Sequence, residues 1–182
     1  MPRLFTGLKV PSDIGLRLSF LKGGLRGARW IDEENYHITL RFIGDVEGHV
    51  ADEIADGLTR IKRWQFDLQI SGLGCFGSKK PHAIWAGILS SPQLLDLQNE
   101  HERIIQRVGL PPEGRKYTPH ITLARVRGLA PGAIADWLAM RGDFGPVGFA
   151  VPEFVLYSAR ASTGGGPYIV EETYGLASVN ED

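Results

Sequence analysis

Cysteine is nearly absent from this chain of 182 residues, which has a single thiol at Cys75. One cysteine excludes an internal disulfide and a cysteine-rich zinc site, and it fits a reducing compartment. No apolar run approaches the roughly 18 residues that a membrane-spanning helix needs. The first residues also lack the cationic and apolar blocks of a secretory signal peptide, so we expect a cytoplasmic protein without a membrane partner.

An excess of charge of either sign is also missing, because 20 Lys and Arg residues face 21 Asp and Glu residues and the net charge is −1. This balance excludes the broad basic surface with which proteins hold long nucleic acids, so any nucleic acid would be bound locally. Hydrophobic residues make up 43% of the chain, which is enough to build a buried core. We expect one folding unit, a monomer that needs no obligatory protein partner.

The hydrophobic pattern switches repeatedly between the strand period and the helix period. Short apolar or alternating stretches bounded by Gly and Pro predict strands, and apolar residues three and four apart predict helices. The predicted strands lie near 3–10, 36–43, 64–71, 82–89, 117–126, 153–160 and 167–176, and the predicted helices follow Pro11, Glu47, Ser91 and Pro131. This mixture predicts an α+β protein.

The tetrapeptide His-Ile-Thr-Leu occurs twice, at 37–40 and at 120–123. The offset of 83 residues also aligns Phe66 with Phe149, and each copy precedes a helix, an alternating strand, a loop and a further strand. Because one unit repeats, we expect an internal duplication: two similar lobes related by a pseudo-twofold axis, with two mainly antiparallel sheets and outer helices around a central cleft. The two motif strands would face each other across that cleft. The single domain spans 1–182, with the motif strands near 36–43 and 118–126.

Strand geometry separates the polar and apolar side chains of each motif. Residues i and i+2 of a strand point to one face, so His37 shares a face with Thr39. His120 and Thr122 repeat this arrangement, and the apolar residues of both motifs point to the core. Histidine acts as acid and base near neutral pH, and threonine hydroxyls can donate hydrogen bonds to phosphoryl oxygens. The pair of motifs therefore predicts in-line opening of a cyclic phosphodiester.

Three neighbouring residues are further candidates for substrate binding. Arg125, five residues after His120, points away from the site by strand alternation and reaches it if the strand bulges or ends. Arg41 lies on the face of His37 by the same alternation, with an ordinary solvated charge as the alternative. Phe42 is suited to stack on a base, while its alternation matches the apolar residues of the motif and favours core packing.

The paired His-x-Thr motifs resemble those of the two-histidine (2H) phosphoesterase superfamily. Within it, the chain is similar to the bacterial and archaeal RNA 2′,3′-cyclic phosphodiesterases, which are also called 2′-5′ RNA ligases. The similarity runs from Arg3 to about Leu176 and includes the segments RLFTGLKVP, NYHITLRFIGDV, CFGSKKPHAIWAGI and YTPHITLARV. The doubled motif is the specific part of this similarity.

The resemblance implies hydrolysis of a 2′,3′-cyclic phosphate to a 2′-phosphate, on RNA 3′ ends or small cyclic nucleotides, without a metal or nucleotide cofactor. It implies that His120 is the base for water and His37 the acid for the 3′-oxygen, and it matches Arg125 to an arginine near the phosphate. The residues alone leave both assignments of acid and base open.

Three other interpretations stay open beside this hydrolase. One is cleavage of a different cyclic nucleotide, another is joining of tRNA halves through a 2′-5′ bond by the same site, and the third is a non-catalytic module that binds RNA ends. A metal site is not predicted, because no acidic residue and no third histidine shares the strand faces of His37 and His120.

Overall fold

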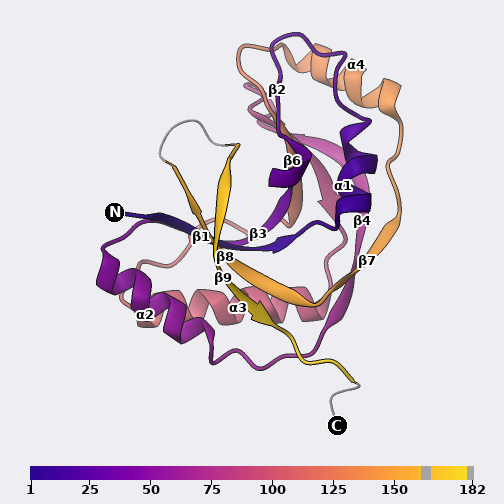
Figure 1. Ribbon diagram of the computed structural model, residues 1–182. Coiled ribbons are helices and arrows are strands. Elements are labelled where there is room, and N and C mark those ends of the chain that lie inside the picture. Colours follow the sequence, from indigo (N-terminus) through magenta and orange to yellow (C-terminus); the bar gives the residue numbers. More distant parts are fainter. Residues whose placement is uncertain (161–164, 180–182) are drawn as a thin grey trace.

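The computed structural model describes residues 1–160 and 165–179. Within these ranges the chain forms nine strands, four α-helices and one 3-10 helix (Figure 1). The strands are β1 (Arg3–Lys9), β2 (Arg29–Trp30), β3 (His37–Asp45), β4 (Phe66–Phe76), β5 (Ala83–Ile88), β6 (His120–Arg125), β7 (Val147–Val151), β8 (Glu153–Ala159) and β9 (Tyr168–Gly175). The helices are α1 (Ser12–Ser19), α2 (Gly48–Leu58), α3 (Pro92–Arg107), α4 (Pro131–Arg141) and the 3-10 helix η1 (Glu33–Asn35). The predicted α+β class is confirmed.

The helix starts agree with the sequence signals. α3 begins where Ser91 and Pro92 predict, and the Ser91 hydroxyl accepts a hydrogen bond from the amide of Leu94 at 3.1 Å. β2 and η1 are not predicted, because elements of two or three residues are too short to show a hydrophobic period.

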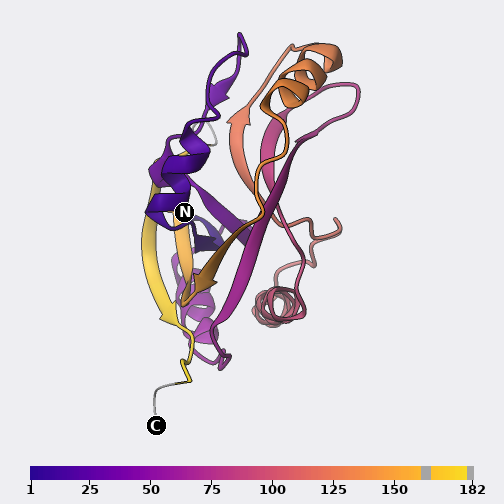
Figure 2. The ribbon, with the colours of Figure 1, turned by 90° about the vertical axis from the view of Figure 1, so that its right-hand side faces the viewer.

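The strands follow one another in a single sheet of order β7-β4-β5-β6-β3-β1-β8-β9, and β2 pairs with β6. This arrangement differs from the expected pair of sheets, because β3 and β6 are antiparallel neighbours that join the two halves at Ile38 and Ile121. The motif strands therefore lie side by side, and they do not face each other across a cleft. In Figure 2, yellow β9 runs along one side of the molecule, and magenta β4 begins near the end of β9, where Trp64 and Ala177 form a bridge, and runs away from it.

The helices anchor the apolar faces of these strands. α2 and α3 lie together at one end of the molecule, and α4 lies at the other end (Figure 1). Ile54 and Leu58 of α2 and Leu94 and Leu97 of α3 belong to the main core cluster, while Trp137 of α4 belongs to a smaller one over β5 and β6. Within the described ranges, no helix combines the length and the apolarity that a bilayer span requires. The motif strands thus have a buried back and leave their other face for polar groups.

The positions of α2 and α4 support an internal duplication, because both of their boundaries differ by the 83 residues that separate the motifs. The last strands of the two units differ in place, since β5 lies between β4 and β6 whereas β9 lies at the sheet edge beside β8. β1 takes the place next to β3 that β5 takes next to β6. We propose two similar lobes within one domain, in which β1 completes the half that contains β3.

Candidate active site

The junction of β3 and β6 brings the two motifs together. Ile38 and Ile121 pair across the junction, and both side chains are fully buried. The neighbours of a buried strand residue point to the opposite face, and antiparallel register sets the histidine of one motif beside the threonine of the other. The two histidines and two threonines therefore share one face of the sheet.

β6 contains a bulge that changes which side chains face the site. Thr122 and Ala124 pair with successive residues of β5, so Leu123 is an extra residue in this ladder. Beyond an extra residue, the alternation of side chains is inverted. Arg125 therefore points to the same face as His120, and the condition that the sequence sets for Arg125, a bulged strand, is met.

A cavity of about 110 Å³ lies over this face of the sheet. Polar residues of both motifs and residues of neighbouring segments line it. The lining residues are Ile31, Asn35, His37, Thr39, Phe76, Ala83, His120, Thr122, Arg125 and Tyr168. Five of the seven candidate residues from the sequence are among them. Within the described residues, His, Cys, Asp and Glu side chains form no group of three or more that could hold a metal ion.

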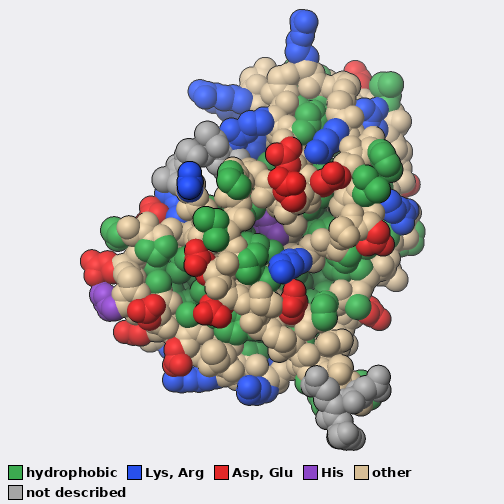
Figure 3. All heavy atoms as spheres, viewed as in Figure 1, with side chains coloured by type: hydrophobic (Ala, Val, Ile, Leu, Met, Phe, Trp, Pro, Cys, Tyr) green, Lys and Arg blue, Asp and Glu red, His purple; other side chains and the backbone are tan. Residues whose placement is uncertain are grey.

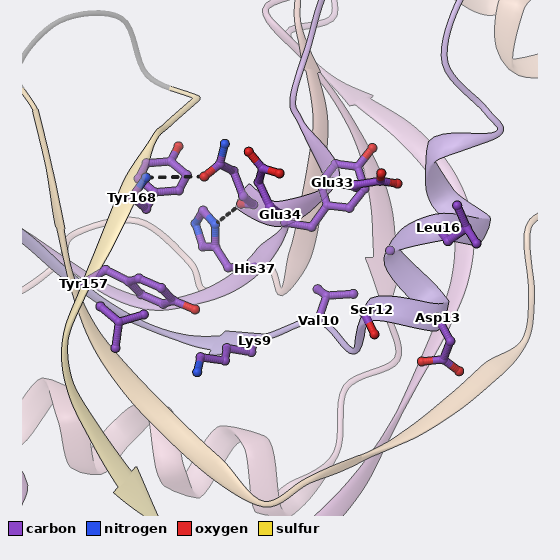
Figure 4. A pocket seen from close by; sticks show the side chains of 14 residues that line it. Lys9, Val10, Ser12, Asp13, Leu16, Glu33, Glu34, His37, Tyr157 and Tyr168 are labelled. Carbon is purple, nitrogen blue, oxygen red and sulfur yellow. Dashed lines mark hydrogen bonds between the residues drawn. The ribbon is translucent and has the colours of Figure 1, made fainter.

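His37 lies between a backbone carbonyl and a group of aromatic rings (Figure 4). Its Nδ1 is 2.9 Å from the carbonyl oxygen of Asn35, whose side chain accepts a hydrogen bond from the amide of Tyr168 at 3.3 Å. The rings of Phe5 and Tyr168 lie 4.9 Å from the imidazole, measured between centroids. Burial lowers the pKa of His37 to about 4; the other histidine and the arginine of the cavity act in the same direction, against the carbonyl hydrogen bond.

His120 has a similar environment. Its Nδ1 is 2.6 Å from the carbonyl oxygen of Thr118, and the ring of Phe76 meets the imidazole edge-on at 4.8 Å. Burial lowers the pKa of His120, and the charge of Arg125 adds to this effect while the hydrogen bond to Thr118 opposes it. Both imidazoles are therefore neutral near pH 7 when no ligand is bound.

The two carbonyl contacts determine the tautomer of each histidine. A carbonyl oxygen only accepts hydrogen bonds, so the proton of neutral His37 and of neutral His120 resides on Nδ1. Nε2 then carries a lone pair, and the hydroxyl of Thr39 donates to this atom of His37 at 3.1 Å. In both histidines, Nε2 is thus the atom that accepts a proton when the ring is neutral and donates one when it is charged.

Known proteins share both the sequence pattern and the fold. The model of the family described as LigT like Phosphoesterase matches residues 8–85 and 88–168. The chain belongs to this family. The RNA 2′,3′-cyclic phosphodiesterase of Thermotoga maritima is 34% identical to this chain over 178 residues, and the match covers 92% of each chain. The RNA 2′,3′-cyclic phosphodiesterase of Aeropyrum pernix is 40% identical over 100 residues, and the match covers 54% of this chain and 57% of the relative. A solved structure from Thermus thermophilus has a TM-score of 0.83 at 21% identity, covers 97% of this chain and 99% of its own, and shows that the fold is shared.

The match confirms the resemblance to two-histidine phosphoesterases. One of the predicted site residues, Arg41, does not lie on the face of the histidines. Thr39 and Arg41 pair with successive residues of β1, so Leu40 is an extra residue, as in β6. The Arg41 guanidinium instead donates hydrogen bonds to the Glu102 carboxylate on α3 and, at 2.6 Å, to the carbonyl of Pro111. The predicted position of Arg41 is wrong, because strand alternation does not extend across a bulge.

The same bulge places Phe42 on the site side of the sheet. Phe42 pairs with Phe5, whose ring contacts His37, and its side chain is 47% exposed. The expectation that Phe42 packs in the core is therefore wrong. Its ring lines a groove beside the cavity.

The sequence prediction missed the aromatic rings that surround the two histidines. Tyr168 contacts His37 and Trp85 lies 6.4 Å from His120, and these two aromatic residues are separated by the same 83 residues as the motifs. Extending the internal repeat beyond the motifs would have found this pair. Phe76 gave no such signal, because the residue 83 positions later is not aromatic.

Proposed function

We propose that this protein hydrolyses the 2′,3′-cyclic phosphate of RNA 3′ ends, or of small cyclic nucleotides, to a 2′-phosphate in the cytoplasm. His37 and His120 act as acid and base, and no metal takes part. The observation that supports this proposal is the single cavity that both histidines, both motif threonines and Arg125 line. The names of the two curated relatives, both RNA 2′,3′-cyclic phosphodiesterases, support the reaction.

In the proposed step, a water oxygen attacks phosphorus on the side opposite the 3′-oxygen. Nε2 of the neutral histidine takes a proton from this water, and the bond between phosphorus and the 3′-oxygen breaks. Nε2 of the charged histidine gives its proton to the departing 3′-oxygen, which leaves a 2′-phosphate. We assign His120 as the base and His37 as the acid, as the family resemblance implies.

Arg125 and the two threonines stabilise the negative charge that gathers on the non-bridging oxygens. Thr39 has a particular part in this scheme, because its hydroxyl donates to Nε2 of neutral His37. When His37 is charged, Nε2 carries a hydrogen and cannot accept that bond. The hydroxyl of Thr39 is then released to donate to a phosphoryl oxygen, so charging of the acid and binding of the phosphate favour each other.

Hydrolysis in the presence of EDTA tests the proposal. We expect the protein to convert a nucleoside 2′,3′-cyclic phosphate to the 2′-phosphate at a rate that EDTA does not change. Phosphorus NMR of the product distinguishes the 2′-phosphate from the 3′-phosphate. Absence of product, a 3′-phosphate product, or activity that EDTA removes and a divalent ion restores would each contradict the proposal.

The pH dependence of kcat/KM should be bell-shaped, because one histidine must be charged while the other is neutral. The pKa of His37 is lowered to about 4, and the pKa of His120 is also lowered. Each imidazole therefore loses its proton at a pH below 6.5, the ordinary pKa of histidine. The alkaline limb of kcat/KM, which reports the free protein, should therefore lie below pH 6.5. The limb of kcat should lie higher, because the bound phosphate raises the pKa of both histidines. A profile that is flat from about pH 5 to 9 would rule out the pair.

A further inference from the structure

The catalytic cavity is too small for a whole nucleotide. Its volume of about 110 Å³ lies well below the roughly 300–1,000 Å³ of pockets that enclose small-molecule ligands. A cyclic phosphate can enter this space, whereas the attached nucleoside and the rest of an RNA strand must lie in an adjoining hollow. The hollows beside the cavity therefore determine the direction in which the RNA strand leaves it.

Two larger hollows adjoin the cavity, one beside each of the two histidines. The first, which we call the acidic hollow, has a volume of about 600 Å³ and shares Asn35, His37 and Tyr168 with the cavity. The second, which we call the basic groove, has a volume of about 710 Å³ and shares Thr39, Phe76 and His120 with it. Either is large enough for a nucleoside, and aromatic rings line both, so the charge of the lining must decide between them.

The acidic hollow is unsuited to a polyanion. Asp13, Glu33 and Glu34 line it, and its lysine, Lys9, lies 3.5 Å from the carboxylate of Glu153 (Figure 4). Figure 3 shows acidic side chains gathered around a depression near the middle of this face, where a histidine is visible. A second phosphate group placed here would meet like charges, which raises its free energy.

The basic groove has the opposite character. Exposed Arg115 and Lys116 line it, together with Arg41 and the carboxylates of Glu102 and Glu113. Arg41 neutralises Glu102, and Glu113 lies 3.2 Å from Arg115, so the five charged groups of this groove sum to one net positive charge. This local charge fits the nearly neutral composition of the whole chain, which allows only a short contact with nucleic acid.

Two phenylalanine rings line the groove, and one of them, Phe76, also lines the cavity. Phe42 is 47% exposed, and Phe76 contacts the imidazole of His120 at 4.8 Å. Exposed aromatic faces bind single-stranded RNA by stacking on its bases, at about 1–3 kcal/mol for each base. No base-specific hydrogen bond is needed for this contact, so it accepts different bases.

The loop that carries the two cations is held in place. The amide of Glu113 donates to Glu102 at 3.0 Å, and the hydroxyl of Tyr117 donates to the carbonyl of Thr39 at 2.9 Å. These bonds connect the loop to α3 and to the motif strand β3. Arg115 and Lys116 are thus presented at a defined distance from the cavity, although their side chains are exposed.

We propose that the RNA strand bearing the cyclic phosphate leaves the cavity through the basic groove, where Phe42 stacks on a base and Arg115 and Lys116 bind a phosphate further along the strand. The proposal rests on the proposed function and names its substrate class: a single-stranded oligonucleotide in preference to a mononucleotide. The acidic hollow remains free of RNA.

The test compares a trinucleotide that ends in a 2′,3′-cyclic phosphate with a nucleoside 2′,3′-cyclic phosphate. In the variant Arg115→Ala/Lys116→Ala, we expect kcat/KM for the trinucleotide to fall about tenfold relative to kcat/KM for the mononucleotide. The slope of log kcat/KM against log salt for the trinucleotide should become shallower by about one. Phe42→Ala should lower the same ratio without changing that slope, because it removes stacking and no charge.

Arg60→Ala/Arg103→Ala is the matched control, since it removes two cations outside both hollows, one just after the end of α2 and one on α3. It should leave the ratio unchanged. Lys9→Ala tests the competing exit, and a selective loss of trinucleotide activity in this variant alone would overturn the proposal. An equal effect of Arg115→Ala/Lys116→Ala on both substrates would overturn it as well.

Failure of the proposed function would give a different result. If the parent hydrolyses neither substrate, fluorescence anisotropy with a labelled trinucleotide 3′-phosphate still tests the groove by binding. We expect the dissociation constant to rise about tenfold in Arg115→Ala/Lys116→Ala and to stay unchanged in Arg60→Ala/Arg103→Ala. Equal binding by the parent and both variants would exclude the groove.

Discussion

Replacing either His37 or His120 by alanine is expected to lower kcat for a nucleoside 2′,3′-cyclic phosphate by about 10²- to 10⁴-fold. Each variant removes one of the two proton transfers, while Arg125 and the threonines still line the cavity for the phosphate. The double variant should be little worse than either single variant, because the two groups act in one step. Steady-state kinetics of the three variants measure these effects.

The pH profiles of the single variants assign the roles. If His120 is the base, His120→Ala loses the acidic limb of the profile and keeps the alkaline limb, and His37→Ala does the reverse. His49→Ala is the control, because His49 is 69% exposed on α2 and lies away from the cavity. Exchanged limbs would reverse the assignment, and a loss below tenfold in both variants would contradict acid-base catalysis by this pair.

Replacing Arg41 by methionine should destabilise the fold by about 3–5 kcal/mol, because it leaves a partly buried carboxylate without its cation. The Arg41 and Glu102 side chains are 7% and 17% exposed. Burial raises the pKa of Glu102, but hydrogen bonds from Arg41, Gln106 and the amide of Glu113 together hold it below its ordinary value. Urea unfolding at pH 7 measures the loss.

Two further variants separate this effect from lost packing. Arg41→Met/Glu102→Leu should recover a large part of the stability, since it removes the uncompensated charge as well. Arg60→Met removes an arginine from an exposed i,i+4 pair with Asp56, so its effect should stay within about 0.5 kcal/mol. In Arg41→Met the penalty should also shrink as the pH falls, because Glu102 then takes up a proton. A loss that is equal at pH 7 and pH 4 would contradict this explanation.

The repeat of His-Ile-Thr-Leu shows how much of the site is local information. Strand alternation has a period of two within four residues, so it separates His37 and Thr39 from the core without reference to any other part of the chain. The structure brings both histidines and both threonines to one cavity. The same local rule gave wrong positions for Arg41 and Phe42, which lie one and two residues beyond the motif.

The errors have a common physical cause. Both motif strands carry an extra residue at the motif leucine, and a bulge depends on the neighbouring strand against which the ladder forms. The pairing of β3 with β1, and of β6 with β5, joins residues at least 28 positions apart in the sequence. The hydrophobic pattern of the sequence contains no information on that pairing. The prediction therefore continued the strict alternation of side chains past the motif, without a bulge.

By itself, the sequence determined the α+β class, the family and the four polar residues of the two motifs, because periodicity and a repeated motif are properties of short segments. Only the tertiary structure decided that one sheet joins the motifs edge to edge, that Arg125 points into the cavity, and that Arg41 turns away to Glu102. These features depend on contacts between residues far apart in the chain, such as Arg41 and Glu102, which are 61 positions apart. A local sequence pattern contains no information on the energies of such contacts.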